Sequence, residues 1–165
     1  MGEMRSDDFE RLFADHAGPL LAFLVYRTGD RALSEDLVAE TFERALRARR
    51  GFDRRKASEK TWVYSIALNC VRDHVRRRQA EQRAYQRASD LARVSATGGP
   101  LDEVDDRDLL ARALRGLSVE EREAIALRYG GDLTVPEIAK LQGEKLSTVE
   151  GRVYRALRKL RAELE

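Results

Sequence analysis

Apolar side chains recur at intervals of three and four residues along most of the chain, which is the spacing of amphipathic α-helices. The first such stretch begins at Phe9, and Gly18-Pro19 predicts an interruption or a fresh helix start within it. Composition also favours helices over strands, because 36% of the residues are charged and only 7% are aromatic. We therefore expect an all-α fold.

A second helix is predicted between two glycines. It follows Gly29-Asp30, takes Ser34 as its N-cap and ends at Gly51. One stripe of this helix is apolar at helical spacing, whereas acidic residues suit its first turn. A polar, basic loop at residues 53–60 leads from it to a third, long helix.

The third helix has a distinct polar face. Asn69, Arg72 and Arg76 follow each other at intervals of three and four residues, so their side chains share one side. An amide suits a pocket for an extruded base, whereas arginines suit phosphates. Trp62 and Tyr64 stand nearby, and aromatic rings beside cations can stack on unpaired bases or act as wedges between strands. Core packing is the alternative for Trp62.

The apolar pattern lapses over residues 81–104, which contain Thr-Gly-Gly-Pro and indicate a flexible linker. We therefore predict two small helical domains, residues 1–80 and 105–165. The second should hold four short helices, and three capping boxes mark helix starts within it. These capping boxes are Ser118/Glu121, Thr134/Glu137 and Ser147/Glu150.

The segment from Thr134 to Val149 has helix-turn-helix spacing, with a short helix, a turn at Gly143 and a longer helix. The first side chains of the longer helix would then be free to enter a major groove. Arg152 and Arg155 would reach phosphates or guanine edges. A plain helical hairpin with a basic surface is the alternative for this segment.

The net charge of +2 conceals large local differences. Residues 1–48 carry −4, residues 49–80 carry +7, residues 81–110 carry −3 and residues 111–165 carry +2. Two basic blocks separated by acidic or neutral sequence are typical of two surfaces that bind polyanions, although solvated helix faces would explain either block alone. The small total predicts that the free protein binds DNA weakly.

The sequence lacks the common catalytic motifs. It has no GxxxxGK phosphate loop, no GxSxG elbow and no HExxH pair. His16, His74 and the single Cys70 supply neither a zinc ligand set nor an internal disulfide. We expect no enzyme activity, no metal and no cofactor. With no stretch of roughly 18 apolar residues and no signal-peptide core, we expect a cytoplasmic protein without membrane insertion.

Four sequence segments carry a resemblance to a known family. They are Ser34-Glu35-Asp36-Leu37-Val38-Ala39-Glu40-Thr41-Phe42, Thr61-Trp62-Val63-Tyr64-Ser65-Ile66-Ala67-Leu68-Asn69, Asp73-His74-Val75-Arg76-Arg77, and the helix-turn-helix that ends in Arg152-Val153-Tyr154-Arg155-Ala156. In this order and spacing, over roughly residues 9–80 and 105–162, the chain resembles the extracytoplasmic-function group of bacterial sigma-70 factors.

The resemblance implies a promoter-specificity factor for RNA polymerase with two helical domains. The first domain would bind the polymerase β′ clamp and would open and read the −10 element, whereas the second would read the −35 element as a duplex. Residues 81–104 would connect the domains through the polymerase. The implied partners are core RNA polymerase (β′ clamp and β subunits), promoter DNA and an anti-sigma factor.

The resemblance also assigns individual residues to these roles. The implied polymerase-binding residues are Asp36, Leu37, Glu40 and Phe42. The implied −10 residues are Lys60, Trp62, Tyr64, Asn69, Arg72, Arg76 and Arg77. The implied −35 residues are Ser147, Thr148, Glu150, Arg152, Arg155 and Arg158.

The turn of the helix-turn-helix departs from the family pattern. Family members usually carry an apolar residue where this chain has Glu144, commonly Leu where it has Gln142, and Lys-Ser where it has Glu150-Gly151. We expect Leu146 to take the apolar role at the turn. Glu150 is expected either to cap its helix or to accept a hydrogen bond from a cytosine amino group.

Two other functions are alternatives. A helix-turn-helix regulator would bind duplex DNA without polymerase, and it would need neither the Asp36/Glu40/Phe42 surface nor the Trp62/Asn69 face. A helical adaptor that binds only proteins would show no salt-dependent affinity for DNA, contrary to what two basic blocks predict.

Overall fold

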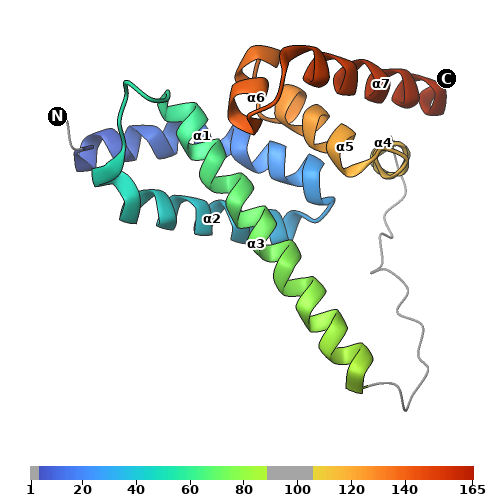
Figure 1. Ribbon diagram of the computed structural model, residues 1–165, viewed down its shortest axis with the longest axis horizontal. Helices are drawn as coiled ribbons and strands as arrows, with labels where there is room; N and C mark the ends of the chain where they lie inside the picture. Colours follow the sequence, from blue (N-terminus) through green and yellow to red (C-terminus); the bar gives the residue numbers. More distant parts are fainter. Residues whose placement is uncertain (1–3, 89–105) are drawn as a thin grey trace.

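The computed structural model describes residues 4–88 and 106–165, and no β-strand occurs within these ranges. The predicted all-α fold is confirmed. Figure 1 shows two groups of helices, with the second group lying against α1 of the first. The elements are α1 (Ser6–Thr28), α2 (Arg31–Ala48), the 3-10 turn η1 (Arg49–Gly51), α3 (Glu59–Ala88), α4 (Asp106–Arg115), α5 (Val119–Ile125), the π-helical turn η2 (Ala126–Gly130), α6 (Val135–Gln142) and α7 (Leu146–Leu164).

The first group is held together by an apolar core. Helix α1 packs against α2, and α2 packs against α3. Leu12, Leu20 and Leu24 of α1 are fully buried, as are Val63 and Ala67 of α3. Burying one such large aliphatic side chain contributes about 1.5–3 kcal/mol, so the packing of these three helices fixes the faces that remain outside.

Two helix boundaries in the first group differ from the prediction. Helix α1 runs through Pro19 without a break, because Gly18 and Pro19 are exposed and water can replace the lost backbone hydrogen bond. Helix α2 is capped by Asp30, whose Oδ1 accepts the N–H of Leu33 at 3.0 Å. The predicted cap at Ser34 is wrong, since this residue is buried and its hydroxyl donates to the Asp30 carbonyl at 2.6 Å.

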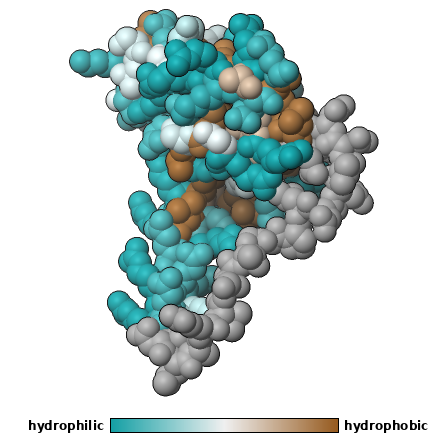
Figure 2. Space-filling model, turned by 90° about the vertical axis from the view of Figure 1, so that its right-hand side faces the viewer, coloured by the Kyte–Doolittle hydropathy of each residue, from teal (hydrophilic) through white to brown (hydrophobic). Residues whose placement is uncertain are grey.

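Helix α3 is longer than predicted. Residues 76–88 are exposed, and this half of α3 projects beyond the other helices (Figure 1). Figure 2 shows hydrophilic side chains around this projection. Residues 81–88, predicted as the start of the linker, continue the helix because Ala, Glu, Gln and Arg are strong helix formers even without an apolar face. The predicted linker residues 89–104 lie outside the described residues.

The second group confirms two of the three predicted capping boxes. Oγ of Ser118 accepts the N–H of Glu121 at 3.1 Å, while the Glu121 carboxylate accepts the N–H of Ser118 at 3.0 Å. Thr134 and Glu137 form the same arrangement at the start of α6. The third predicted box is wrong, because α7 begins one residue before Ser147 and has no side-chain cap.

The two groups share one continuous apolar core. The turn η2 packs on α1, and α6 contacts α3. Gly130 lies against the backbone of Phe23, and Gly131 lies against the ring of Tyr64. The sequence did not indicate whether the two predicted domains associate. In the structure they are packed directly against each other.

Replacing serine at two positions tests the assigned helix starts. We expect Ser118→Ala to lower the free energy of unfolding by about 1 kcal/mol, because an N–H group at the start of α5 loses its acceptor. The matched control Ser147→Ala should change it by less than about 0.5 kcal/mol. Urea unfolding followed by far-UV circular dichroism measures both values. Equal losses would contradict the assigned start of α7.

Candidate nucleic-acid and polymerase interfaces

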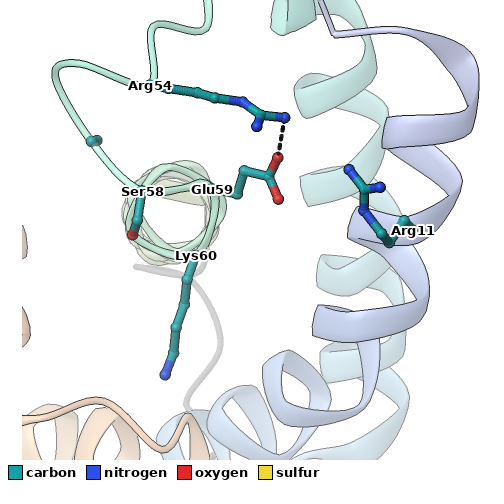
Figure 3. Close-up of a pocket in the computed structure, with 6 residues that line it drawn as sticks. Arg11, Arg54, Ser58, Glu59 and Lys60 are labelled. Carbon is teal, nitrogen blue, oxygen red and sulfur yellow. Dashed lines mark hydrogen bonds and ion pairs between the residues drawn. The ribbon is translucent and has the colours of Figure 1, made fainter.

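The polar segment before α3 forms an open hollow lined by cations. Ser58 caps α3, since its Oγ accepts the backbone N–H three residues further on at 3.1 Å. Arg54 donates to Glu59 at 2.9 Å, and Arg11 of α1 lines the opposite side (Figure 3). Lys60 extends away from this pair, towards the second helix group.

The polar face predicted for α3 forms as expected. Asn69, Arg72, Arg76 and Arg77 are all exposed. Helical geometry places Asn69, Arg72 and Arg76 on one side of α3, and Arg77 lies at the edge of that side. Nη1 of Arg72 donates to Oδ1 of Asn69 at 3.4 Å. The face therefore presents one amide and two guanidinium groups to solvent, with the Arg77 guanidinium at its edge.

The two aromatic residues near this face have different environments. Trp62 is half-buried and packs on Phe52, with ring centroids 4.8 Å apart. Tyr64 is fully buried, and its hydroxyl donates to the Gly131 carbonyl at 3.3 Å. The prediction of Tyr64 as a surface residue for DNA is wrong in this conformation, because residues two positions apart on a helix point to different sides. Burial raises the pKa of the Tyr64 hydroxyl.

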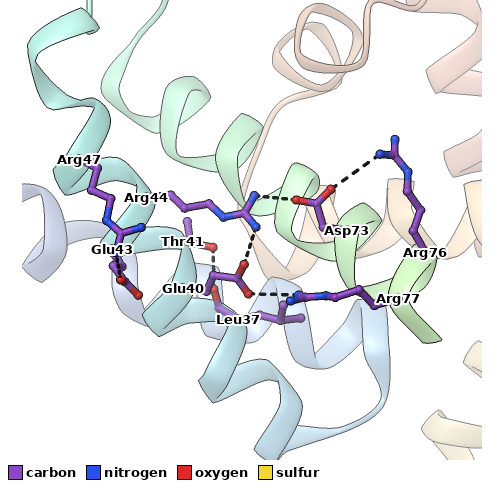
Figure 4. Close-up of polar contacts among 9 residues, drawn as sticks. All are labelled: Leu37, Glu40, Thr41, Glu43, Arg44, Arg47, Asp73, Arg76 and Arg77. Atoms are coloured by element: carbon purple, nitrogen blue, oxygen red, sulfur yellow. Dashed lines mark hydrogen bonds and ion pairs between the residues drawn. The ribbon is translucent and has the colours of Figure 1, made fainter. Parts of the chain in front are cut away.

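A network of ion pairs joins α2 to the cationic face of α3 (Figure 4). Arg44 of α2 donates to Asp73 of α3 at 2.8 Å and also pairs with Glu40 on its own helix. Glu40 lies 3.7 Å from the guanidinium of Arg77, and Asp73 lies 3.9 Å from that of Arg76. The hydrogen bond from Arg44 lowers the pKa of Asp73. The acidic face of α2 is thus connected to the arginines of α3.

The predicted polymerase-binding residues of α2 fall into two sets. Asp36 is exposed, and Glu40 is partly exposed. Leu37 and Phe42 are buried, with 2% and 5% of their surface accessible. The prediction of these two as surface contacts is corrected, since they attach α2 to the core. Phe42 packs on Phe13 of α1, with ring centroids 4.8 Å apart.

The helix-turn-helix is present, and its turn differs from the prediction. Gly143 ends α6 with a φ of 65°, a left-handed conformation that favours glycine. The N–H of Glu144 donates to the Ala139 carbonyl at 2.9 Å, and its carboxylate pairs with Arg152 at 2.9 Å. Leu146 is 46% exposed, so the prediction that it takes an apolar role is wrong. The Glu144–Arg152 ion pair lies at the turn in place of an apolar contact.

A buried acid holds the cations in the middle of α7. Glu121 of α5 is 6% exposed, and it accepts a hydrogen bond from Lys159 at 2.8 Å and lies 3.9 Å from Nε of Arg155. The Arg155 guanidinium crosses Gly151, where an added Cβ would lie 3.1 Å from its Nη1. Arg158 is exposed. Glycine at position 151 therefore gives the Arg155 side chain room to lie along the helix.

The remaining predicted −35 residues lie at the start of α7. Ser147 and Glu150 are exposed, and Thr148 is partly buried. Because α7 has no side-chain cap, the prediction that Glu150 caps it is wrong. Contact between Glu150 and a cytosine stays a prediction.

Sequence reasoning did not predict the ion pairs of Arg44, Asp73 and Glu121. The four-residue spacing of Glu40 and Arg44 is a visible signal for an ion pair on one helix. The other pairings join residues from separate helices, so only the packing of those helices brings them together.

Neither a metal centre nor a membrane span stands out in the described part of the chain. Within residues 4–88 and 106–165, no three His, Cys, Asp or Glu side chains are grouped in a way that could hold a metal ion. No helix there combines the length and the apolar character needed to cross a bilayer.

Comparison with protein families gives two matches in chain order. Residues 12–81 match the family model described as Sigma-70 region 2, and residues 107–160 match the one described as Sigma-70, region 4. The chain is also 32% identical over 157 residues to the ECF RNA polymerase sigma factor SigL of Mycobacterium tuberculosis, covering 93% of this chain and 87% of SigL. The chain belongs to the extracytoplasmic-function group of the sigma-70 family.

Other relatives of this sigma factor agree. The ECF RNA polymerase sigma factor BldN of Streptomyces coelicolor is 31% identical over 159 residues, which cover 94% of this chain and 60% of BldN. Among solved structures, the sigma factor RpoE of Bartonella quintana, in complex with the anti-sigma factor NepR, matches with a TM-score of 0.75 and 26% identity. That match covers 96% of this chain and 97% of RpoE. The chain is accordingly a promoter-specificity factor for core RNA polymerase.

Protonation of the buried acid should affect the stability of this sigma factor. The hydrogen bond from Lys159 holds the pKa of Glu121 below its ordinary value of 4.5. Its stabilising effect is therefore present above pH 4.5 and is lost as the pH falls through the lowered pKa. We expect Glu121→Gln to lower the free energy of unfolding by about 1–3 kcal/mol at pH 7.

The difference between wild type and Glu121→Gln should narrow as the pH falls from about 6 to about 3. Urea unfolding at several pH values measures this narrowing. The exposed Glu163→Gln is the control, and it should change stability by less than about 0.5 kcal/mol. A difference that stays constant with pH would contradict the role of the Glu121 carboxylate.

Proposed function

We propose that this sigma factor divides promoter recognition between its two helix groups. Residues 1–80 bind core RNA polymerase and open and read the −10 element, and residues 105–165 read the −35 element. Residues 81–104 connect them through the polymerase. The observation that carries this proposal is the exposed amide and guanidinium face of α3, which lies beside the acidic surface of α2.

The face of α3 has the chemistry needed for a partly melted promoter. Arg72, Arg76 and Arg77 can neutralise phosphates, while the Asn69 amide can both donate to and accept from an unpaired base. The exposed part of Trp62 offers a ring for stacking. Lys60 adds a cation near the start of the same helix.

We assign polymerase binding to the acidic surface of α2. Asp36 and Glu40 face solvent in part or in full, and carboxylates there can pair with basic residues of the β′ clamp. Leu37 and Phe42 support this surface from below, because their burial fixes the rotation of α2 about its axis.

The start of α7 carries the proposed −35 contacts. Ser147, Thr148 and Glu150 occupy the first turns of the second helix of a helix-turn-helix, which is the part that enters a major groove. Further along α7 lie Arg152, Arg155 and Arg158, which can contact the phosphates of the −35 duplex.

Control by an anti-sigma factor is part of the proposal. RpoE of Bartonella quintana was solved with such a partner, and its similarity extends over both helix groups of this chain. We infer the same kind of partner here. We also infer that the chain acts in the cytoplasm and catalyses no reaction itself.

Transcription with core polymerase tests the proposed function. The purified chain with core RNA polymerase should start transcripts from genomic DNA at mapped sites that share −10 and −35 elements. A regulator that acts without polymerase would shift duplex DNA alone and would start no transcript. That second result would overturn the proposal.

Two arginines on opposite sides of α3 form a matched pair for testing the −10 face. Arg76 lies on the proposed face and Arg78 lies on the other side of the helix, and both are exposed. We expect Arg76→Ala to lower promoter opening about fivefold or more. The slope of its logarithm against the logarithm of salt concentration should fall by about 1, which corresponds to the loss of one phosphate contact.

The control Arg78→Ala should leave promoter opening and its salt dependence close to those of wild type. Permanganate footprinting of the opened promoter at several salt concentrations provides the measurement. Equal losses in the two variants would indicate a general effect of charge and would contradict a specific face.

A further inference from the structure

The outer half of α3, residues 76–88, is exposed on all sides and projects beyond the other helices (Figure 1). It carries five arginines and one acid, Glu81, so its net charge is +4. Its one large apolar side chain, Tyr85, is 66% exposed. A helix that docks in an apolar groove of a protein needs an apolar face, which this half lacks. Its charge and polarity suit a polyanion instead.

The arginines of the outer half continue the proposed −10 face. Arg83 follows Arg72 by eleven residues, and Arg87 follows Arg76 by the same interval. Eleven residues complete about three helical turns, so both pairs of arginines lie on one side of α3. The cationic face therefore runs on to the end of the helix.

The inner and outer pairs of arginines differ in their partners. Arg76 lies 3.9 Å from Asp73, whose carboxylate also accepts a hydrogen bond from Arg44. Among the described residues, Arg83 and Arg87 have no ion-pair partner. A phosphate that binds the outer pair therefore displaces no acid of this chain.

The outer pair lies too far along α3 to share the melted segment that Asn69 would read. At about 1.5 Å per residue, Arg83 and Arg87 lie about 21 and 27 Å from Asn69 along the helix axis. These distances correspond to about six to eight base pairs of duplex. The carboxyl end of α3 leads towards the helix group that is proposed to read the −35 element. The outer pair would therefore meet the DNA between the two elements, which is double-stranded.

We propose that Arg83 and Arg87 form a third promoter contact, which binds phosphates of the duplex spacer between the −10 and −35 elements. The contact adds affinity and carries no base preference, because it involves the DNA backbone. It takes residues 81–88 out of the predicted connector. The proposal rests on the proposed function, since that function places α3 on the promoter.

Single substitutions test this contact in the holoenzyme formed from the full chain and core RNA polymerase. We expect Arg83→Ala and Arg87→Ala each to weaken binding to a mapped promoter about threefold, and the double variant about tenfold. The slope of log affinity against log salt concentration should fall by about 1 in each single variant and by about 2 in the double variant. Filter binding at several salt concentrations measures both quantities.

Two further variants serve as controls. Arg78→Ala removes an exposed arginine from the other side of the same half of α3, and it should change neither the affinity nor the slope. Replacing both Arg83 and Arg87 with lysine should preserve most of the slope, because lysine also neutralises phosphates. Circular dichroism checks that each variant keeps its helices, and alanine favours the helix at both positions.

Uncharged DNA locates the contact without any change to the protein. Methylphosphonate linkages remove the negative charge from chosen phosphates, here those in the spacer within about eight base pairs of the −10 element. They should weaken wild-type binding about tenfold and leave the Arg83→Ala/Arg87→Ala variant almost unaffected, because that variant has already lost the two contacts. The same linkages placed downstream of the start site should affect the two proteins equally.

Three results would overturn the spacer contact. One is a folded double variant that binds the promoter with wild-type affinity and slope. Another is a wild-type holoenzyme that loses no affinity on the uncharged spacer. The third is weaker assembly of the double variant with core polymerase in the absence of DNA, which would assign the surface to a protein partner.

Run-off transcription by the wild-type holoenzyme separates this proposal from the proposed function. Its failure would overturn the proposed function. Wild-type transcription together with unchanged promoter binding by the double variant would overturn only the spacer contact.

Discussion

The close approach of the η2 backbone to α1 and α3 determines how the two helix groups are related. Gly130 meets the Phe23 backbone, and Gly131 meets the ring of Tyr64. Because neither glycine carries a side chain, the apolar cores of the two groups merge into one. The packing then sets which cations are free and which are held, since Lys60 and Arg27 both end on the opposite group.

Carboxylates accompany most of the cations proposed to bind DNA. Asp73 and Glu40 lie close to Arg76 and Arg77, while Glu144 pairs with Arg152. A phosphate must compete with these acids for each guanidinium. Some of the acids that hold the net charge at +2 thus lie beside the cations proposed to bind DNA. Such pairs lower non-specific affinity for DNA more than affinity for a site with several correctly placed acceptors.

Much of the fold could be predicted because helical periodicity and capping are local. The capping boxes at Ser118 and Thr134 mark the starts of α5 and α6 correctly, since each motif supplies its own hydrogen bonds. Ser147 begins a third such motif, and Ser34 was predicted as a simple N-cap, yet neither caps its helix. At Ser34 another capping residue stands four positions earlier, and at Ser147 the helix has already begun. Local motifs thus compete, and the pattern alone does not decide between them.

The sequence predicts which side chains of the candidate site share a helix face. It does not predict the contacts between helices that pack together from distant parts of the chain. The exposed arrangement of Asn69, Arg72 and Arg76 follows from helical spacing. The burial of Tyr64 depends on the second helix group, which lies 67 residues further along the chain at Gly131. The periodicity of α3 carries no information about that contact. The long-range ion pairs are hidden for the same reason.

The contact between the helix groups is apolar at its centre. The turn η2 packs on α1, and the buried side chains of both groups form one cluster. One ion pair and the hydrogen bond from Lys60 lie beside this core. A partner that binds the two groups apart must supply the free energy of this packing, whereas a partner that binds them together gains from it.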